Sequence, residues 1–180
     1  MNKQLALLTV LVLTCGAAFA GGIAPAEAPT VGTFGGSIAP ELVIPIRSFN
    51  DRQGVGGGGV ASLAYAVMEG LDVYVTSGYL AFAGQRHAIA PGDTVKRTEK
   101  AIPVVAGLEY YLMPGLHVGP ELGYHRFFDG KGTNKFSIGP VVGYTVNISN
   151  VGVDLSGEYT YAKDFEYLGV RLGLRYWTGL

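Results

Sequence analysis

Residues 102–124, IPVVAGLEYYLMPGLHVGPELGY, constrain the fold more than any other part of the chain, because their side chains alternate in character. Two runs place an apolar residue at every second position, and the turn sequence at residues 113–115 separates them. The other face mixes glycine with carboxylates and histidine. Period-two alternation of this length predicts two antiparallel strands in a hairpin. Such an apolar face packs into a soluble core or turns toward lipid, and the rest of the chain must distinguish these.

The composition of the chain favours the arrangement in which the apolar face turns toward lipid. Of the 180 residues only 15% are charged, and the net charge of -1 excludes the basic character of nucleic-acid binding proteins. The mean hydropathy of +0.29 is high, yet no apolar run after the N-terminal segment is long enough for a spanning helix. A transmembrane barrel combines these properties, since each of its strands needs only about 9–11 residues.

The N-terminus predicts export. Residues 1–20 carry one lysine, an apolar stretch and the small-x-small pattern Ala18-Phe19-Ala20, which together are typical of a secretory signal peptide. Cys15 lies inside this segment and is not preceded by a lipobox, so we expect no lipid anchor. Residues 21–31 are rich in Ala, Pro and Gly and are expected to form an extended leader.

Residues 32–180 are predicted to form one β-barrel domain. Eight segments alternate in character: 32–46, 60–68, 71–82, 102–112, 116–124, 136–148, 151–161 and 167–177. The third segment has no clean face, so its orientation stays open. Long and tight connections alternate, with residues 47–59, 83–99 and 128–135 longer than 69–70, 113–115 and 149–150. This rhythm is typical of outer-membrane barrels and places both termini on the tight-turn, periplasmic side. The predicted fold class is all-β, an eight-stranded antiparallel up-and-down transmembrane β-barrel; a soluble meander is the alternative.

Aromatic residues gather near both ends of the predicted strands and suggest two interfacial girdles. The predicted girdles comprise Phe34, Tyr110, Tyr111, Tyr176 and Trp177 at the tight-turn end, and Phe49, Phe82, Tyr124, Phe127, Phe128, Phe136, Tyr159, Tyr161, Phe165 and Tyr167 at the loop end.

The predicted inward face carries the charged residues. They are Glu41, Glu109, Glu121, Asp154, Glu158, Arg171, Arg175, His117 and His125. An eight-stranded barrel is about wide enough for side chains to fill, so buried charges there must pair. Arg171 and Arg175 share one row, and we expect them to face Asp154 or Glu158 on the preceding strand. The sequence therefore predicts an interior salt-bridge network, with a narrow cation-preferring path as the alternative because acids exceed arginines.

The sequence gives only weak signals for catalysis, metal binding or phosphate binding. His117 and His125 lie on one strand, roughly 26 Å apart, too far to share a metal, and the residues predict no catalytic set, metal site or cofactor. The glycine run at residues 56–59 lacks the lysine of a phosphate loop and is expected to be a flexible loop. Arg86, His87, Lys96, Arg97 and Lys100 make the second loop basic, which is consistent with a solvated loop or with contact to lipopolysaccharide.

The segments VTSGYLAF, IPVVAGLEYYL, GLHVGPELGYH and LGVRLGLRYW resemble the small OmpA/OmpX-like outer-membrane barrels. The resemblance implies export through the periplasm, insertion into the outer membrane by the barrel-assembly machinery, and outer-membrane lipids as partners. It also implies a non-enzymatic structural or surface-interaction role through the outward loops. Members of this family often end on an aromatic residue that aids recognition during assembly. This sequence departs from that pattern, because three more residues follow Trp177. Two alternatives remain: a lipid-modifying enzyme, with Arg47, His125, Arg126 and Asp129 at the outer rim, and a soluble lipocalin-like binding barrel.

Overall fold

The computed structural model describes residues 24–51, 53–84, 86–90, 93–96, 98–128, 132–148 and 151–178. The predicted signal peptide with Cys15 therefore lies outside the described residues. In the described part of the chain, the helix found is the short α2 (Arg47–Asn50), and none is long and apolar enough to cross a membrane.

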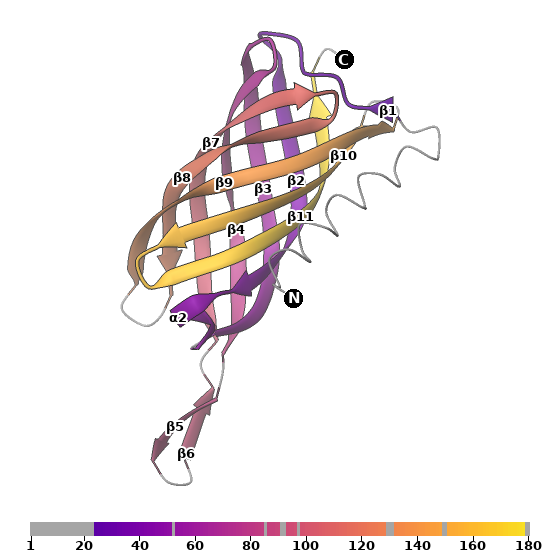
Figure 1. The fold of residues 1–180 in the computed structure, drawn as a ribbon. Coiled ribbons are helices and arrows are strands. Elements are labelled where there is room, and N and C mark those ends of the chain that lie inside the picture. Colours follow the sequence, from indigo (N-terminus) through magenta and orange to yellow (C-terminus); the bar gives the residue numbers. More distant parts are fainter. Residues whose placement is uncertain are drawn as a thin grey trace.

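Eight long strands close into a ring in which each strand pairs antiparallel with its two neighbours (Figure 1). The ring follows the chain order, and the pairing of β11 with β2 closes it. The prediction of an eight-stranded up-and-down barrel is confirmed. The strands are β2 (Phe34–Pro45), β3 (Gln53–Met68), β4 (Leu71–Gly84), β7 (Glu99–Met113), β8 (Leu116–Phe127), β9 (Thr133–Ile148), β10 (Val151–Ala162) and β11 (Phe165–Trp177).

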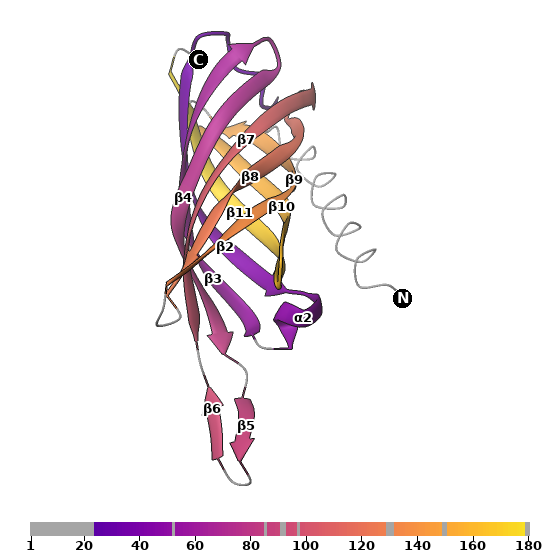
Figure 2. The ribbon, with the colours of Figure 1, turned by 90° about the vertical axis from the view of Figure 1, so that its left-hand side faces the viewer.

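The two ends of the barrel differ (Figures 1 and 2). At one end, tight turns at residues 69–70 and 114–115 contain Gly70 and Gly115 with φ of +74° and +81°, a conformation that glycine adopts at little cost. At the other end lie α2 and the hairpin of β5 (Arg86–Ala90) and β6 (Asp93–Lys96), which projects beyond the barrel. The last connection, which joins the predicted segments 151–161 and 167–177, is short, since only residues 163–164 separate β10 from β11.

The predicted flexible loop at residues 56–59 is wrong. These four glycines lie within β3 and pair with both neighbouring strands, for example Gly57 with Leu42 and Gly58 with Leu80. A side chain at Gly58 would collide with the backbone oxygen of Tyr79 on β4. The glycines therefore permit close strand contact, and the first loop shrinks from the predicted 47–59 to residues 46–52.

The apolar face of the barrel points outward. Leu63, Ile38 and Phe34 are 75%, 64% and 63% exposed, whereas Glu158 is only 4% exposed. A soluble protein of this size would bury such residues. The polarity is that of a barrel surrounded by lipid, with polar side chains filling its interior.

The structure shows which face of the third strand, β4, points inward. Its even positions point inward, so that Asp72, Tyr74 and Thr76 are buried together with Leu80 and Phe82, while Val73 and Val75 are exposed. Sequence left this open because each face carries both polar and apolar residues.

Part of the predicted aromatic girdles is wrong. Seven of the named aromatic residues are buried instead of lying on the outer surface: Phe49, Phe82, Tyr111, Phe127, Phe165, Tyr167 and Trp177. The physical reason is the period of two, which sends neighbouring aromatic residues such as Tyr176 and Trp177 to opposite faces. The outward set, which includes Phe34, Tyr110 and Tyr176 at the tight-turn end and Tyr124, Phe136 and Tyr161 at the loop end, remains exposed.

The buried aromatic residues at the loop end form a compact apolar cluster inside the barrel. Phe165 lies at its centre, with ring centroids 4.7 Å from Phe49 of α2, 4.7 Å from Phe127 and 5.9 Å from Phe82. Val43, Leu80, Ala101, Ala162 and Tyr167 complete this cluster. The barrel is therefore filled by apolar packing at the loop end.

The opposite end is crossed by the segment before β2. Its strand β1 (Ala24–Pro25) pairs with the end of β9. The amide of Ala26 donates to the Thr145 carbonyl (3.0 Å), and its carbonyl accepts from Gly115 (2.7 Å). The chain then runs across the tight-turn end to β2, where Gly32 donates to the Ala66 carbonyl (2.9 Å) (Figure 1). This segment covers part of the tight-turn mouth.

Candidate functional site

The interior between these two ends holds the polar residues that the sequence analysis singled out. Eight of the nine are buried, and the side chain of Arg175 is 12% exposed. They come from five different strands, because inward positions on every strand of a narrow barrel converge on the same space. Two arginines organise them into two layers, four residues apart along β11.

The first layer surrounds Arg171. Its Nε donates to Glu41 of β2 (3.1 Å), its Nη1 to Glu121 of β8 (3.0 Å), and its Nη2 contacts Glu158 of β10. Three strands thus supply a carboxyl group to three nitrogens of one guanidinium. Such charge-assisted contacts are among the stronger ones in proteins, provided that the buried charges balance.

The second layer surrounds Arg175. Its two terminal nitrogens donate to the two oxygens of Glu109 on β7, at 2.7 and 2.9 Å, and Nη1 also donates to the Tyr111 hydroxyl at 3.0 Å. Arg171 thus contacts Glu158 of the preceding strand, whereas the bidentate partner of Arg175 lies on the far wall. Sequence could not anticipate this, because a contact across the lumen has no signature in strand order.

Asp154 is engaged by His117 instead. His117 Nε2 lies 2.8 Å from Asp154 Oδ2, which also accepts a hydrogen bond from Thr145 at 2.8 Å. His117 is on β8 and Asp154 on β10, so the imidazole must reach across β9. It passes over Gly143, where a Cβ atom would lie 2.6 Å from the imidazole Nε2. The inward glycine therefore makes this contact possible.

His125 lies deeper toward the loop end. Its Nδ1 is 3.1 Å from the Ser137 hydroxyl and its Nε2 is 3.1 Å from the Tyr167 hydroxyl. Its neighbour Arg126 is exposed on the outer face of the same strand. A lipid-modifying enzyme would need His125 and Arg126 to meet at the outer rim. These two side chains instead point to opposite sides of the barrel wall. Asp129 lies outside the described residues.

Several interior polar residues were missed by sequence reasoning. Tyr74 donates to Glu121 Oε1 (2.7 Å), and the hydroxyls of Thr76 and Ser62 are 2.6 Å apart. Asp72 is fully buried opposite Glu109, and neither of its oxygens has a well-formed hydrogen bond among the described residues. For Asp72, Tyr74 and Thr76 the available signal was the even face of the third predicted segment, whose orientation the sequence leaves open because neither face is clean.

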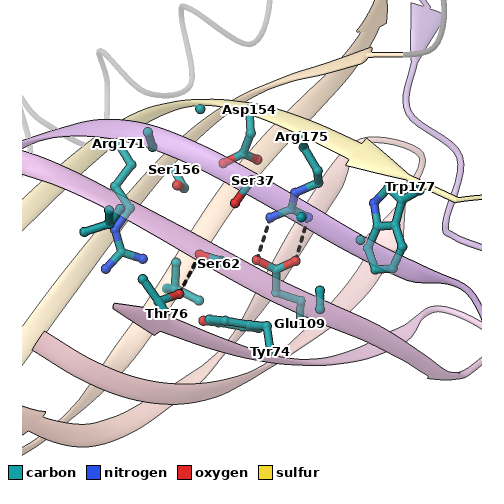
Figure 3. Close-up of a pocket in the computed structure, with 17 residues that line it drawn as sticks. Ser37, Ser62, Tyr74, Thr76, Glu109, Asp154, Ser156, Arg171, Arg175 and Trp177 are labelled. Carbon is teal, nitrogen blue, oxygen red and sulfur yellow. Dashed lines mark hydrogen bonds and ion pairs between the residues drawn. The ribbon is translucent and has the colours of Figure 1, made fainter. Parts of the chain in front are cut away.

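A small cavity lies between the two arginine layers, against the small side chains of β2 and β3 (Figure 3). Its volume is about 30 Å³, and Ser37, Ser62, Glu109 and Asp154 are among its lining residues. A space of this size holds one or two water molecules. Among the described residues, no group of three or more His, Cys, Asp or Glu is arranged to hold a metal ion.

Comparison with known proteins is informative at the level of structure. No protein-family model and no curated protein sequence matches the chain. The solved structure of OprG from Pseudomonas aeruginosa matches with a TM-score of 0.67 at 12% identity, covering 86% of this chain and 99% of that one. Neisserial surface protein A matches with a TM-score of 0.58 at 17% identity, covering 81% and 98%.

Ail, the attachment invasion locus protein of Yersinia pestis, matches with a TM-score of 0.55 at 18% identity, covering 82% of this chain and 99% of Ail. These structures span nearly the whole barrel, and their identities are low enough that the likeness concerns the fold. The chain therefore has the fold of the small eight-stranded outer-membrane β-barrels.

Proposed function

We propose that this protein is an integral outer-membrane barrel without enzymatic activity, which serves the envelope as a structural element and contacts its surroundings through its loop end. The observation that carries the proposal is the inverted polarity of the wall. Leu63, Ile38 and Leu172 are more than half exposed, while Glu41, Asp154 and Glu158 are buried inside. In water this arrangement would expose a large apolar surface, whereas a bilayer covers it.

The interior supports a closed barrel in preference to a pore. The aromatic cluster around Phe165 fills the loop end, the two arginine layers fill the middle, and the cavity between the layers is about 30 Å³. A hydrated ion path needs a continuous column of water, which this packing leaves little room for. We infer that the network of Arg171 and Arg175 holds the wall strands together and that the barrel does not conduct.

The loop end is the proposed contact surface. The hairpin of β5 and β6 projects from it, and this hairpin contains Arg86, His87 and Lys96, whose side chains lie outside the described residues. Exposed Lys100 and Arg126 lie on neighbouring strands at the same end. Basic side chains at this height would meet the phosphates of lipopolysaccharide in the outer leaflet. Ail has also been solved in complex with a heparin analogue, sucrose octasulfate, which makes a polyanion a reasonable partner class to test.

The soluble lipocalin-like alternative requires the apolar faces to point inward and the arginine row to be exposed. The described residues have the opposite arrangement, with Arg171 buried and Leu172 and Leu174 exposed. The enzyme alternative depends on His125, which is buried between hydroxyls and aromatic rings. Replacing His125 by Ala and measuring lipid A modification in cells would support that alternative only if the modification pattern changed.

Membrane fractionation tests the main proposal. We expect the protein in the outer-membrane fraction, with a band whose electrophoretic mobility in detergent changes on heating. Recovery in the aqueous periplasmic fraction would contradict it. Single-channel recording in planar bilayers then tests closure, and steady ion conductance by the folded protein would show that the barrel is a pore.

The loop proposal has its own test. Binding of purified lipopolysaccharide to the barrel in detergent is compared with binding to a variant in which Arg86, Lys96 and Arg97 are replaced by Gln. We expect weaker binding by this variant, and binding by the unmodified protein should decline with salt. The control is Glu69→Gln, which changes an exposed charged side chain in the tight turn at the opposite end of the barrel and should bind like the unmodified protein. Undiminished binding by the triple variant would contradict the proposal.

A further inference from the structure

The interior contains more acidic side chains than basic ones can balance. Among the described residues, six buried carboxyl groups face the lumen: Glu41, Asp72, Glu109, Glu121, Asp154 and Glu158. The positive side chains that lie beside these carboxyl groups are Arg171 and Arg175, joined by His117 and His125 if both imidazoles are charged. Even then two carboxyl groups have no counter-charge. An isolated ionised carboxylate in such surroundings is costly, and the usual response is to bind a proton.

The excess divides evenly between the two layers. Glu41, Glu121 and Glu158 surround Arg171, with His125 on the loop side. Asp72, Glu109 and Asp154 belong to the layer of Arg175 and His117. Each layer therefore has one carboxyl group more than its positive side chains, even with its histidine charged.

We propose that the barrel interior is a proton-binding site that retains at least two protons at neutral pH, one shared within the Glu41–Glu121–Glu158 triad and one on the Asp72–Glu109 pair. Neither proton is required by the proposed role of the loops, so the inference stands apart from that role.

The triad is built to share a proton. All three carboxyl groups contact the same guanidinium, so they crowd together around it. Glu41 Oε1 is buried and has no hydrogen-bond partner among the described residues. Like-charged carboxylates that share one site do not ionise together. The other polar or charged groups that face the triad are Tyr74 from β4, His125 from β8, Thr160 from β10 and Tyr167 from β11.

The second pair is formed by neighbouring strands. Asp72 of β4 and Glu109 of β7 are directly opposite in the strand register, where two like charges destabilise a sheet. Arg175 engages both oxygens of Glu109, whereas neither oxygen of the fully buried Asp72 has a well-formed hydrogen bond among the described residues. The proton therefore belongs on Asp72. The groups that face this pair are Tyr111 from β7, His117 from β8, Asp154 from β10 and Arg175 from β11.

A metal cation is the competing counter-charge, and the geometry favours the proton. The described residues offer no cluster suited to a metal ion. The cavity between the layers is lined by Arg171 and Arg175, whose positive charge would repel a cation. A proton needs no additional space and satisfies a carboxyl oxygen directly.

Infrared spectroscopy of the folded full-length mature chain in lipid vesicles tests the proposal. A protonated carboxyl group has a carbonyl stretching band that is separate from the carboxylate bands and shifts in heavy water. We expect this band at neutral pH in the unmodified protein. Glu158→Gln and Asp72→Asn each remove one of the excess carboxyl groups from one layer, and each should weaken the band. The double variant should weaken the band more than either single change, while Glu69→Gln, at an exposed turn, should leave it unchanged.

The heat-modifiable mobility of each variant verifies that the barrel has folded, and Gln and Asn preserve the shape of the side chains that they replace. Absence of the band in the unmodified protein would overturn the proposal. If the protein were then stabilised by sodium or calcium but not by choline, the counter-charge would be a metal cation. A band as strong in the folded double variant as in the unmodified protein would overturn the assignment to these carboxyl groups.

Discussion

Arg175 of β11 and Glu109 of β7 meet across the barrel through two parallel hydrogen bonds of 2.7 and 2.9 Å. These strands lie four positions apart in the ring of eight, so the pair joins opposite walls. Neighbouring strands are already linked by their backbones. A contact between opposite walls resists flattening of the barrel's cross-section. The backbone hydrogen bonds between neighbouring strands do not provide this resistance.

The first prediction concerns this pair. Arg175→Met leaves Glu109 buried beside Asp72 without its counter-charge, and removing one partner of a buried ion pair typically costs about 3–5 kcal/mol. We expect a loss of this order in the free energy of unfolding, measured by urea denaturation of the barrel in lipid vesicles. Combining Arg175→Met with Glu109→Gln should recover part of the loss. A variant Arg175→Met as stable as the unmodified protein would show that the bond does not support the wall.

The second prediction concerns Gly143, over which His117 reaches Asp154. In Gly143→Ala the added methyl group would lie 2.6 Å from His117 Nε2 and 2.9 Å from Ser156 Cβ. Overpacking of this kind costs about 1–3 kcal/mol, and we expect the imidazole to leave Asp154. The measurement is the unfolding free energy together with the imidazole NMR shifts of His117.

The matched control is Gly36→Ala on β2. A Cβ atom there has its nearest neighbours at 3.7 and 3.9 Å, which is ordinary contact. Equal destabilisation by the two changes would mean that the loss reflects backbone effects of alanine and not the path of His117.

The prediction from sequence was strongest where it rested on alternation. The period of two located the strands and placed Glu41, Glu121, Glu158 and Arg171 on inward faces, because side chains on a strand alternate regardless of their neighbours. It could not determine which inward groups meet across the lumen, since that depends on the tilt and stagger of all eight strands. The bidentate bond between Arg175 and Glu109 is of this kind.

The errors have the same origin. The glycine run at residues 56–59 has no alternation to read, and only its pairing with β2 and β4 shows it to be strand. Asp72 escaped notice because its face of β4 also carries Leu80 and Phe82. That face is polar beside the arginine layers and apolar beside Phe165, a change along one strand that mirrors the two regions of the lumen.

The third prediction concerns the aromatic cluster. Phe165→Ala removes the ring that contacts Phe49, Phe82 and Phe127 and should destabilise the barrel by about 3–5 kcal/mol, as for other buried Phe→Ala changes. Phe128→Ala, whose ring is 48% exposed at the same end, is the control and should have a much smaller effect. Unfolding in urea, followed by Trp177 fluorescence, measures both. Similar losses would show that the interior cluster is not a packed core.

The fourth prediction tests the orientation of the wall in the bilayer. Leu122, in the middle of β8, and Leu112, at the tight-turn end of β7, are similarly exposed at 51% and 56%. An arginine on the lipid face costs about 2–4 kcal/mol at the bilayer midplane and about 0–1 kcal/mol near the interfaces. Leu122→Arg should therefore lower the unfolding free energy in vesicles much more than Leu112→Arg. In a water-soluble barrel both changes would be nearly neutral, because both side chains would remain hydrated. Equal effects at the two depths would thus contradict the placement of the bilayer around the middle of the strands.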